Sequence, residues 1–103
     1  MDNMPVSKCR VEDKPAIILR DTGNNTVIAR ESLVPRAALT GTSCMLQLAN
    51  GKCVLAPEAK VFIESPFFTG MALVSCLKSP LYDVVISNVR GAQDFEDLAR
   101  KTD

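Results

Sequence analysis

Asp21 lies just after an apolar stretch and is the residue in this sequence best placed to do chemistry. Residues 16–19 are apolar and mostly branched, and after Arg20 the chain continues as Asp21-Thr22-Gly23. The apolar run predicts a short buried strand, and Gly23 lets the backbone turn with a positive φ angle where that strand ends. A carboxylate there is costly to bury unless hydrogen bonds or a partner compensate. Asp21 is therefore a candidate catalytic residue, and the alternative is a turn residue whose side chain caps the strand end.

The residue types available narrow the chemistry further. The 103-residue sequence has no histidine and 4 cysteines, Cys9, Cys44, Cys53 and Cys76, whose spacing matches no Cys-x-x-Cys metal motif. The sequence therefore predicts no metal site and no cofactor, and nucleophiles that need a histidine base are excluded. Acid–base chemistry would then fall to carboxylates. We expect the cysteines to be buried or half-buried thiols, with two disulfides as the alternative.

The composition is that of one small globular domain. Hydrophobic residues make up 47% and charged residues 23% of the chain, and 12 basic residues balance 12 acidic ones. A formal charge of zero gives no indication of binding to nucleic acid or to an anionic membrane. No apolar run reaches the roughly 20 residues needed to span a bilayer, and the polar N-terminus lacks the apolar core of a signal peptide. We therefore expect no nucleic-acid partner, no membrane partner and a cytoplasmic location.

Short apolar runs separated by turn residues predict an all-β domain. The first is a hairpin over residues 6–20 that turns at 12–15, where Pro15 follows two acids and a lysine. Proline and acidic residues favour a turn over a strand interior. A further strand begins near residue 26, and residues 30–34 predict a single helical turn that a proline ends.

A second hairpin is predicted around Asn50-Gly51. Asn-Gly between two apolar runs favours a tight turn, because both residues tolerate positive φ angles. The flanking segments at 40–42 and 56–58 contain Gly41 and Pro57 and predict loops that bound this hairpin.

The last third of the chain predicts further strands and one helix. Strands are expected at 59–64, at 67–77 as one strand or a pair, and at 82–86, and Asp83 is expected to face solvent from the last of them. Apolar residues recur at helical spacing over 92–99, which predicts a short terminal helix.

Four stretches taken in order carry a resemblance to a known family. They are residues 18–23 (ILRDTG), 30–35 (RESLVP), 65–70 (SPFFTG) and 80–92 (PLYDVVISNVRGA). Together they resemble the retropepsins, the dimeric aspartic proteases of retroviruses and long-terminal-repeat retrotransposons. The similarity points to the protease segment of gypsy-like elements or to a domesticated derivative of one. The resemblance implies one domain over residues 1–103: a small closed β-barrel of the retropepsin type with a core of about 6–92 and a short C-terminal helix in a tail at 93–103.

The resemblance also implies a site shared between two chains. Each protomer of a homodimer would contribute one Asp21, and the paired carboxyls would share a proton and hydrolyse peptide bonds through an activated water. Thr22 would bond across the dyad to the partner, and Gly23 would let the backbone approach the substrate. Asn24 and Asn25 would line the groove for a polypeptide substrate.

The remaining carried-over positions lie in the second hairpin and after the last strand. Asn50 and Gly51 would form a flap that closes over a peptide bound as an extra strand. Ser87 would lie beside the catalytic loop and the substrate, at a position where the family usually has glycine. A charged Arg20 before the aspartate is similar to the gypsy-like subgroup and unlike the viral enzymes.

Two functions stay open at this point. One is an active aspartic endopeptidase that processes a retrotransposon polyprotein, which the intact Asp21-Thr22-Gly23 favours. The other is a catalytically inactive, retrotransposon-derived dimeric interaction domain, which Ser87 and a flap with a single clear glycine favour.

Overall fold

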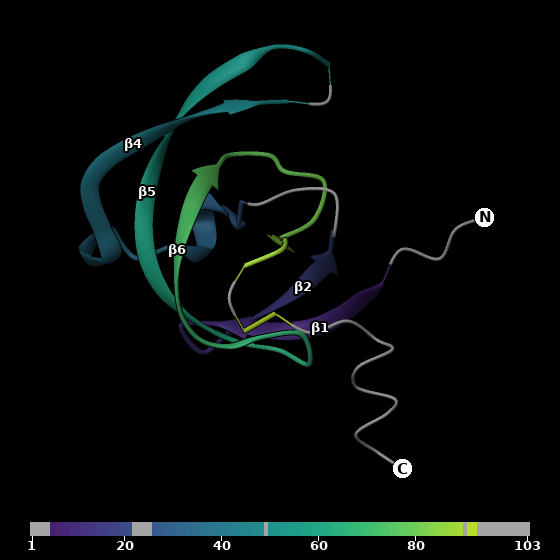
Figure 1. Cartoon of the computed structure of the whole chain (residues 1–103). Coiled ribbons are helices and arrows are strands. Elements are labelled where there is room, and N and C mark those ends of the chain that lie inside the picture. Colours follow the sequence, from purple (N-terminus) through teal and green to yellow (C-terminus); the bar gives the residue numbers. More distant parts are fainter. Residues whose placement is uncertain (1–4, 22–25, 49, 90, 93–103) are drawn as a thin grey trace.

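The chain folds into strands that close on themselves as a barrel (Figure 1). The computed structural model describes residues 5–21, 26–48, 50–89 and 91–92. The strands in chain order are β1 (Val6–Val11), β2 (Lys14–Arg20), β3 (Ile28–Arg30), β4 (Leu39–Gln47), β5 (Cys53–Glu64), β6 (Thr69–Leu77) and β7 (Val84–Ile86). Two short 3-10 helices, η1 (Glu31–Leu33) and η2 (Arg36–Ala38), connect β3 to β4. The expected helical turn at 30–34 is therefore present as η1.

One sheet contains all these strands, in the order β1-β2-β7-β3-β6-β5-β4. The pairing of β1 with β5, at Arg10 with Glu64 and Val11 with Ile63, closes the sheet into a ring. Glu12 reinforces the closure, since its amide donates to the Phe62 carbonyl at 3.0 Å and its carboxylate accepts from the Phe62 amide at 2.6 Å. The expected all-β closed barrel is confirmed.

The terminal helix expected over 92–99 falls almost wholly outside the described residues. Within the part of the chain that the structure describes, no helix is long and apolar enough to cross a bilayer.

The β1–β2 hairpin is confirmed, with one correction to its boundary. Glu12 and Asp13 form the turn with φ angles of 50° and 70°, as a tight hairpin turn requires. Pro15 belongs to β2 and not to the turn, and it pairs with Arg10 of β1. A proline is tolerated there because β7 pairs with β2 only from Ile18 onward, so no second neighbour needs an amide donor at Pro15.

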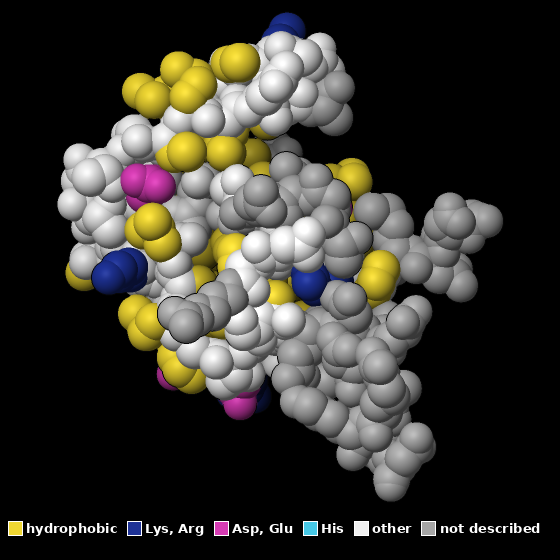
Figure 2. Space-filling view, in the orientation of Figure 1, with side chains coloured by type: hydrophobic (Ala, Val, Ile, Leu, Met, Phe, Trp, Pro, Cys, Tyr) yellow, Lys and Arg dark blue, Asp and Glu magenta, His cyan; other side chains and the backbone are white. Residues whose placement is uncertain are grey.

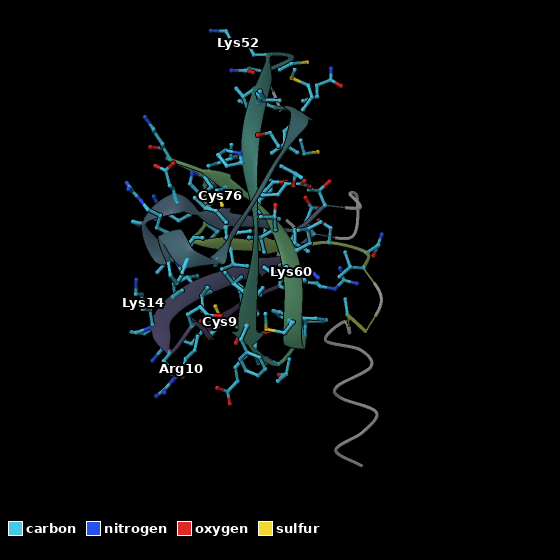
Figure 3. The ribbon with its side chains drawn as sticks, turned by 90° about the vertical axis from the view of Figure 1, so that its left-hand side faces the viewer. Cys9, Arg10, Lys14, Lys52, Lys60 and Cys76 are labelled. Atoms are coloured by element: carbon cyan, nitrogen blue, oxygen red, sulfur yellow. The ribbon has the colours of Figure 1, made fainter. Side chains whose placement is uncertain are left out.

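The predicted Asn50-Gly51 hairpin is also confirmed and forms an arm. Strands β4 and β5 extend beyond the barrel, and Lys52 marks the tip of this β4–β5 arm (Figures 1 and 3). The Gly51 amide donates to the Leu48 carbonyl at 2.9 Å, and Gly51 has a φ angle of 87°. A side chain rarely adopts that angle, so glycine suits this position.

The predictions of loops at 40–42 and 56–58, on either side of this hairpin, are wrong. Residues 40–42 belong to β4, where the register shifts between Leu39 and Ser43 and Gly41 has a φ angle of 87°. This shift is a β-bulge or a similar irregularity, which interrupts the pairing without ending the strand. Strand β5 likewise runs through Pro57, which pairs with Ser43, while β6 begins pairing only at Glu58. On the β6 side, Pro57 therefore has no paired neighbour that would need its missing amide.

The core is the barrel interior, filled by branched and aromatic side chains. The largest fully buried side chains are Phe67, Ile18, Ile63, Ile86, Val11, Val61, Val74, Val84 and Ser87. Within this set Ser87 alone is polar, which makes its position after β7 unusual.

The four cysteines are free thiols in this structure. Cys9 and Cys76 are buried and Cys44 is half-buried, as expected, whereas Cys53 is exposed on the arm.

Candidate active site

Asp21 sits at the point where two neighbouring strands end together. Strands β2 and β7 are parallel, with Leu19 opposite Val85 and Arg20 opposite Ile86. The Asp21 amide then donates to the Ile86 carbonyl at 2.9 Å. Asp21 therefore lies at the end of a buried strand, as expected, and this backbone hydrogen bond holds it there. The residue is half-buried.

A cavity of about 660 Å³ opens beside Asp21, between the barrel and the β4–β5 arm. Figure 2 shows hydrophobic side chains gathered along this arm and a hollow beneath it. Apolar side chains from three regions line this cavity, namely Leu19 and Val85 from the barrel, Leu48 and Val54 from the arm, and Pro80 and Leu81 from the β6–β7 loop. We call this cavity the groove. The groove is therefore a mostly apolar recess, with Asp21, Glu31 and Lys78 as the charged residues among those that line it.

The expected flap residues, Asn50 and Gly51, lie at the tip of the arm and are not among the residues that line the groove. Asn50 uses its side-chain oxygen to accept from the Lys52 amide at 2.9 Å, which stabilises the turn. The arm contributes to the groove through residues on either side of the tip, such as Leu48 and Val54.

Ser87 does not reach the surface of the groove. Its side chain is 0% exposed, so an expected substrate contact is corrected to a buried position one residue beyond Ile86. Among the residues that the structure describes, the Ser87 Oγ has no hydrogen-bond partner. A buried hydroxyl without a partner costs about 1–3 kcal/mol.

Arg20 is buried next to Asp21, at 5% exposure. Its Nη1 donates to the Ile86 carbonyl at 3.4 Å and its Nη2 donates to Asn88 Oδ1 at 3.2 Å. Ile86 thus accepts from both the Arg20 guanidinium and the Asp21 amide. The arginine that precedes the aspartate is a link to the segment after β7.

The other carried-over residues, Thr22, Gly23, Asn24 and Asn25, lie outside the described residues. Their roles stay predictions from the resemblance.

Asp83 is a residue that sequence reasoning misjudged. It was expected to face solvent from a strand, but it precedes β7 and its Oδ1 accepts from Arg30 Nε at 2.8 Å. Its Oδ2 accepts from the Ile17 amide at 2.8 Å. These bonds, first the one from Arg30 and then the one from Ile17, hold the pKa of the Asp83 carboxyl below its usual value. In the sequence, Asp83 is marked only as an acid directly before a buried strand, which does not indicate an ion pair with Arg30.

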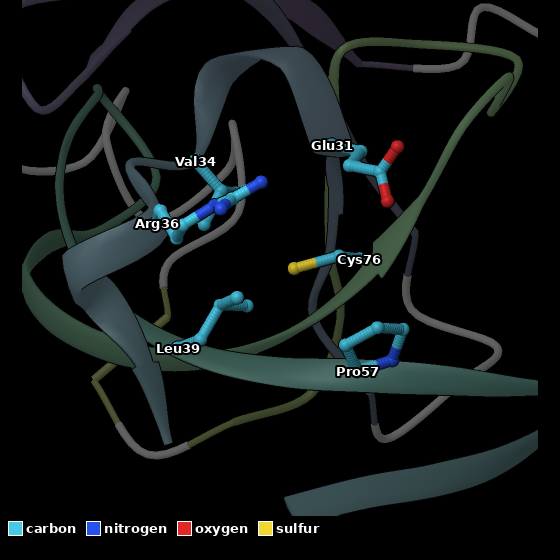
Figure 4. A pocket seen from close by; sticks show the side chains of 6 residues that line it. All are labelled: Glu31, Val34, Arg36, Leu39, Pro57 and Cys76. Carbon is cyan, nitrogen blue, oxygen red and sulfur yellow. The ribbon is translucent and has the colours of Figure 1, made fainter. Parts of the chain in front are cut away.

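A smaller cavity of about 260 Å³ adjoins the groove (Figure 4). Cys76, Glu31 and Pro57 line both spaces, and the Cys76 sulfur points into the smaller one. Burial, and secondarily the charge of Glu31, raises the pKa of the Cys76 thiol. A raised pKa disfavours the thiolate, which is the form in which a cysteine acts as a nucleophile.

No cluster of three metal-ligating side chains occurs among residues 5–21, 26–48, 50–89 and 91–92.

Comparison with known proteins supports the fold. The structure is similar to that of the protease of the retrovirus EIAV, solved in complex with the inhibitor HBY-793, with a TM-score of 0.62 and 15% sequence identity. The similarity covers 99% of this chain and 90% of the EIAV chain. No family model matches the sequence, and no curated protein matches it. At this identity the likeness establishes a retropepsin-like barrel.

Proposed function

We propose that this protein is an aspartic endopeptidase that works as a homodimer, with one Asp21 from each protomer forming the catalytic dyad. The observation that carries the proposal is the placement of Asp21. In a retropepsin-like barrel, its amide is bonded to Ile86 at 2.9 Å and its side chain lines an apolar groove under an arm. Each chain has one Asp-Thr-Gly at 21–23, so a dyad requires two chains.

The chemistry follows from bringing two carboxyls within hydrogen-bond reach. Two such groups cannot both ionise cheaply, so the pair holds one proton, as the paired aspartates of aspartic proteases do in general. The ionised Asp21 takes a proton from the attacking water, and the protonated Asp21 of the second chain polarises the peptide carbonyl. The proton of the second Asp21 then goes to the leaving nitrogen, while the first Asp21 keeps the proton taken from water, so the pair again holds one proton. Thr22 and Gly23 support this loop by carry-over from the family.

The proposed substrate is a polypeptide in extended form. A strand laid between the arm and the barrel would pair with backbone near Gly51 and would place hydrophobic side chains against Leu48 and Leu81. Asn24 and Asn25 are proposed as groove contacts by carry-over from the family. The natural substrate that fits the resemblance is a gypsy-like retrotransposon polyprotein in the cytoplasm.

The second candidate function is an inactive dimeric interaction domain. The buried Ser87 hydroxyl favours it, because the residue follows Ile86, to which Asp21 is bonded, and brings an unsatisfied polar atom into that region. A displaced Asp21 would leave the fold and the dimer intact and would remove catalysis.

Cleavage of a peptide library between about pH 4 and 7 tests the proposal. Wild type is compared with Asp21→Asn, which keeps the size of the side chain and removes its charge. Asp13→Asn is the matched control, since Asp13 is exposed in the β1–β2 turn and asparagine tolerates its φ angle of 70°.

We expect cleavage by wild type and by Asp13→Asn, and none by Asp21→Asn. Equal cleavage by Asp21→Asn would refute the assignment of Asp21. No cleavage by any of the three, with a dimer seen in sedimentation, would favour the interaction domain.

A further inference from the structure

One wall of the groove is a loop and not a strand. The β6–β7 loop, residues 78–83, contributes Pro80 and Leu81 to the lining, and the Leu81 side chain is 85% exposed. A loop has fewer backbone hydrogen bonds than a sheet, so its position depends on individual side-chain anchors.

Arg30 contacts this loop in its middle and at its end, and it also pairs with the residue before it. In the β3–β6 ladder Arg30 is opposite Leu77, the residue before the loop. Its Nη2 donates to the Pro80 carbonyl at 3.3 Å. Its amide donates to the Asp83 carbonyl at 2.7 Å, and its Nε donates to Asp83 Oδ1 at 2.8 Å.

Asp83 ties the same loop to a second strand. While Oδ1 accepts from Arg30 of β3, Oδ2 accepts from the Ile17 amide of β2 at 2.8 Å. Both oxygens are therefore engaged, by two different strands of the barrel. Charge-assisted bonds of this kind are stronger than neutral ones and fix geometry more narrowly.

We propose that Arg30 and Asp83 are positioning residues that hold the Pro80–Leu81 wall of the groove and thereby determine which peptides it binds. The inference rests on the proposed function of the groove as a peptide site. Neither Arg30 nor Asp83 is among the residues that line the groove, so both act through the loop. The side chains of Arg30 and Asp83 are 32% and 29% exposed, which places the ion pair at the edge of the barrel and outside its core.

The chain offers a direct reporter of this loop. Tyr82 is the single tyrosine of the sequence, and there is no tryptophan. Tyrosine fluorescence therefore reports the 78–83 loop alone, and acrylamide quenching of it measures how open the loop is.

The test compares wild type with Arg30→Gln, Arg30→Lys and Asp83→Asn, and uses Lys60→Gln as the matched control. Lys60 is an exposed cation on β5 (Figure 3). Arg30→Lys keeps the charge, but its one nitrogen cannot replace the guanidinium at both Asp83 and Pro80. If Arg30→Gln does not fold, Asp83→Asn keeps an acceptor for the Ile17 amide and takes its place.

We expect acrylamide quenching of Tyr82 to rise about twofold in Arg30→Gln and by less in Arg30→Lys. On peptides that differ in the side chain facing Leu81, we expect KM to rise about fivefold with kcat changed less than about twofold, and the order of preference to change.

Quenching equal to that of Lys60→Gln would overturn the proposal, whatever the activity. More quenching with unchanged KM and preference would also overturn it, because the wall would then move without affecting recognition. A fall in kcat alone would assign the pair to the chemistry at Asp21 instead. If wild type cleaves no peptide, the proposed function fails, and affinity for uncleaved peptides together with Tyr82 quenching still decides whether the pair holds the wall.

Discussion

The Asp21 amide donates to the Ile86 carbonyl at 2.9 Å, although 65 positions separate the two residues in the sequence. This bond makes the end of β7 a support for the proposed catalytic residue. Arg20 strengthens the link, since its guanidinium donates to the same carbonyl and to Asn88. Changes just beyond Ile86 should therefore be transmitted to Asp21.

Ser87→Ala is expected to stabilise the protein. It removes a buried hydroxyl that has no partner among the described residues and keeps the Cβ, so the free energy of unfolding should rise by about 1 kcal/mol. Urea denaturation measures this. A loss of similar size would mean that the hydroxyl has a hydrogen-bond partner in the folded protein.

Ser87→Gly is expected to raise the rate of peptide cleavage, because it removes the buried side chain of the residue next to Ile86, to whose carbonyl the Asp21 amide is bonded. Comparison with Ser87→Ala separates the effect of the hydroxyl from that of the Cβ. If neither variant changes kcat, Ser87 does not limit catalysis.

Two neighbouring residues of β2 should respond very differently to truncation. Ile18 is 0% exposed and Ile17 is 38% exposed. Ile18→Ala should lower the free energy of unfolding by about 2–5 kcal/mol, because it leaves a cavity in the core, and Ile17→Ala by less than about 1 kcal/mol. Equal losses would mean that the inward and outward faces of β2 are assigned wrongly.

Local sequence signals were sufficient for the hairpins and for the location of Asp21. Alternating apolar residues, the Asn50-Gly51 pair and an aspartate after a buried run are all read from neighbours along the chain. The predictions that were wrong concern residues whose structure depends on strands far away in the sequence. The tolerance of β5 for Pro57 follows from where β6 begins to pair, and no local pattern contains that information.

The prediction that Asp83 faces solvent was wrong for the same reason. The partner of Asp83, Arg30, is 53 residues away, and the third participant, the Ile17 amide, belongs to yet another strand. A lone acid before an apolar strand does not distinguish an exposed residue from a structural anchor.

The ion pair should make stability depend on pH in acid. The Asp83 pKa is lowered in the folded chain from its ordinary value of 3.8, so between the two values the unfolded chain binds more protons. The contribution of Asp83 to the free energy of unfolding is therefore complete above the ordinary pKa and is lost as pH falls through the lowered one. Wild type should exceed Asp83→Asn in stability at neutral pH, and the difference should shrink below about pH 4. A difference independent of pH would contradict the ion pair.

The four thiols should react at different rates. Burial, with a smaller effect of Asp83, raises the pKa of Cys9 to about 11, whereas Cys53 is exposed on the arm. Labelling with a thiol reagent near neutral pH should modify Cys53 first, Cys44 next, and Cys76 and Cys9 last. Mass spectrometry of digested samples gives the order. Early labelling of Cys9 would contradict its place in the core.

The central claim is that two chains each supply one Asp21, and mixing wild type with Asp21→Asn tests it most directly. The two proteins are combined in equal amounts and allowed to exchange subunits, and cleavage is measured at fixed total concentration. If every active site needs two intact aspartates, random pairing leaves about one quarter of the wild-type rate. A rate of about one half would mean that each chain acts alone, which would contradict the dyad.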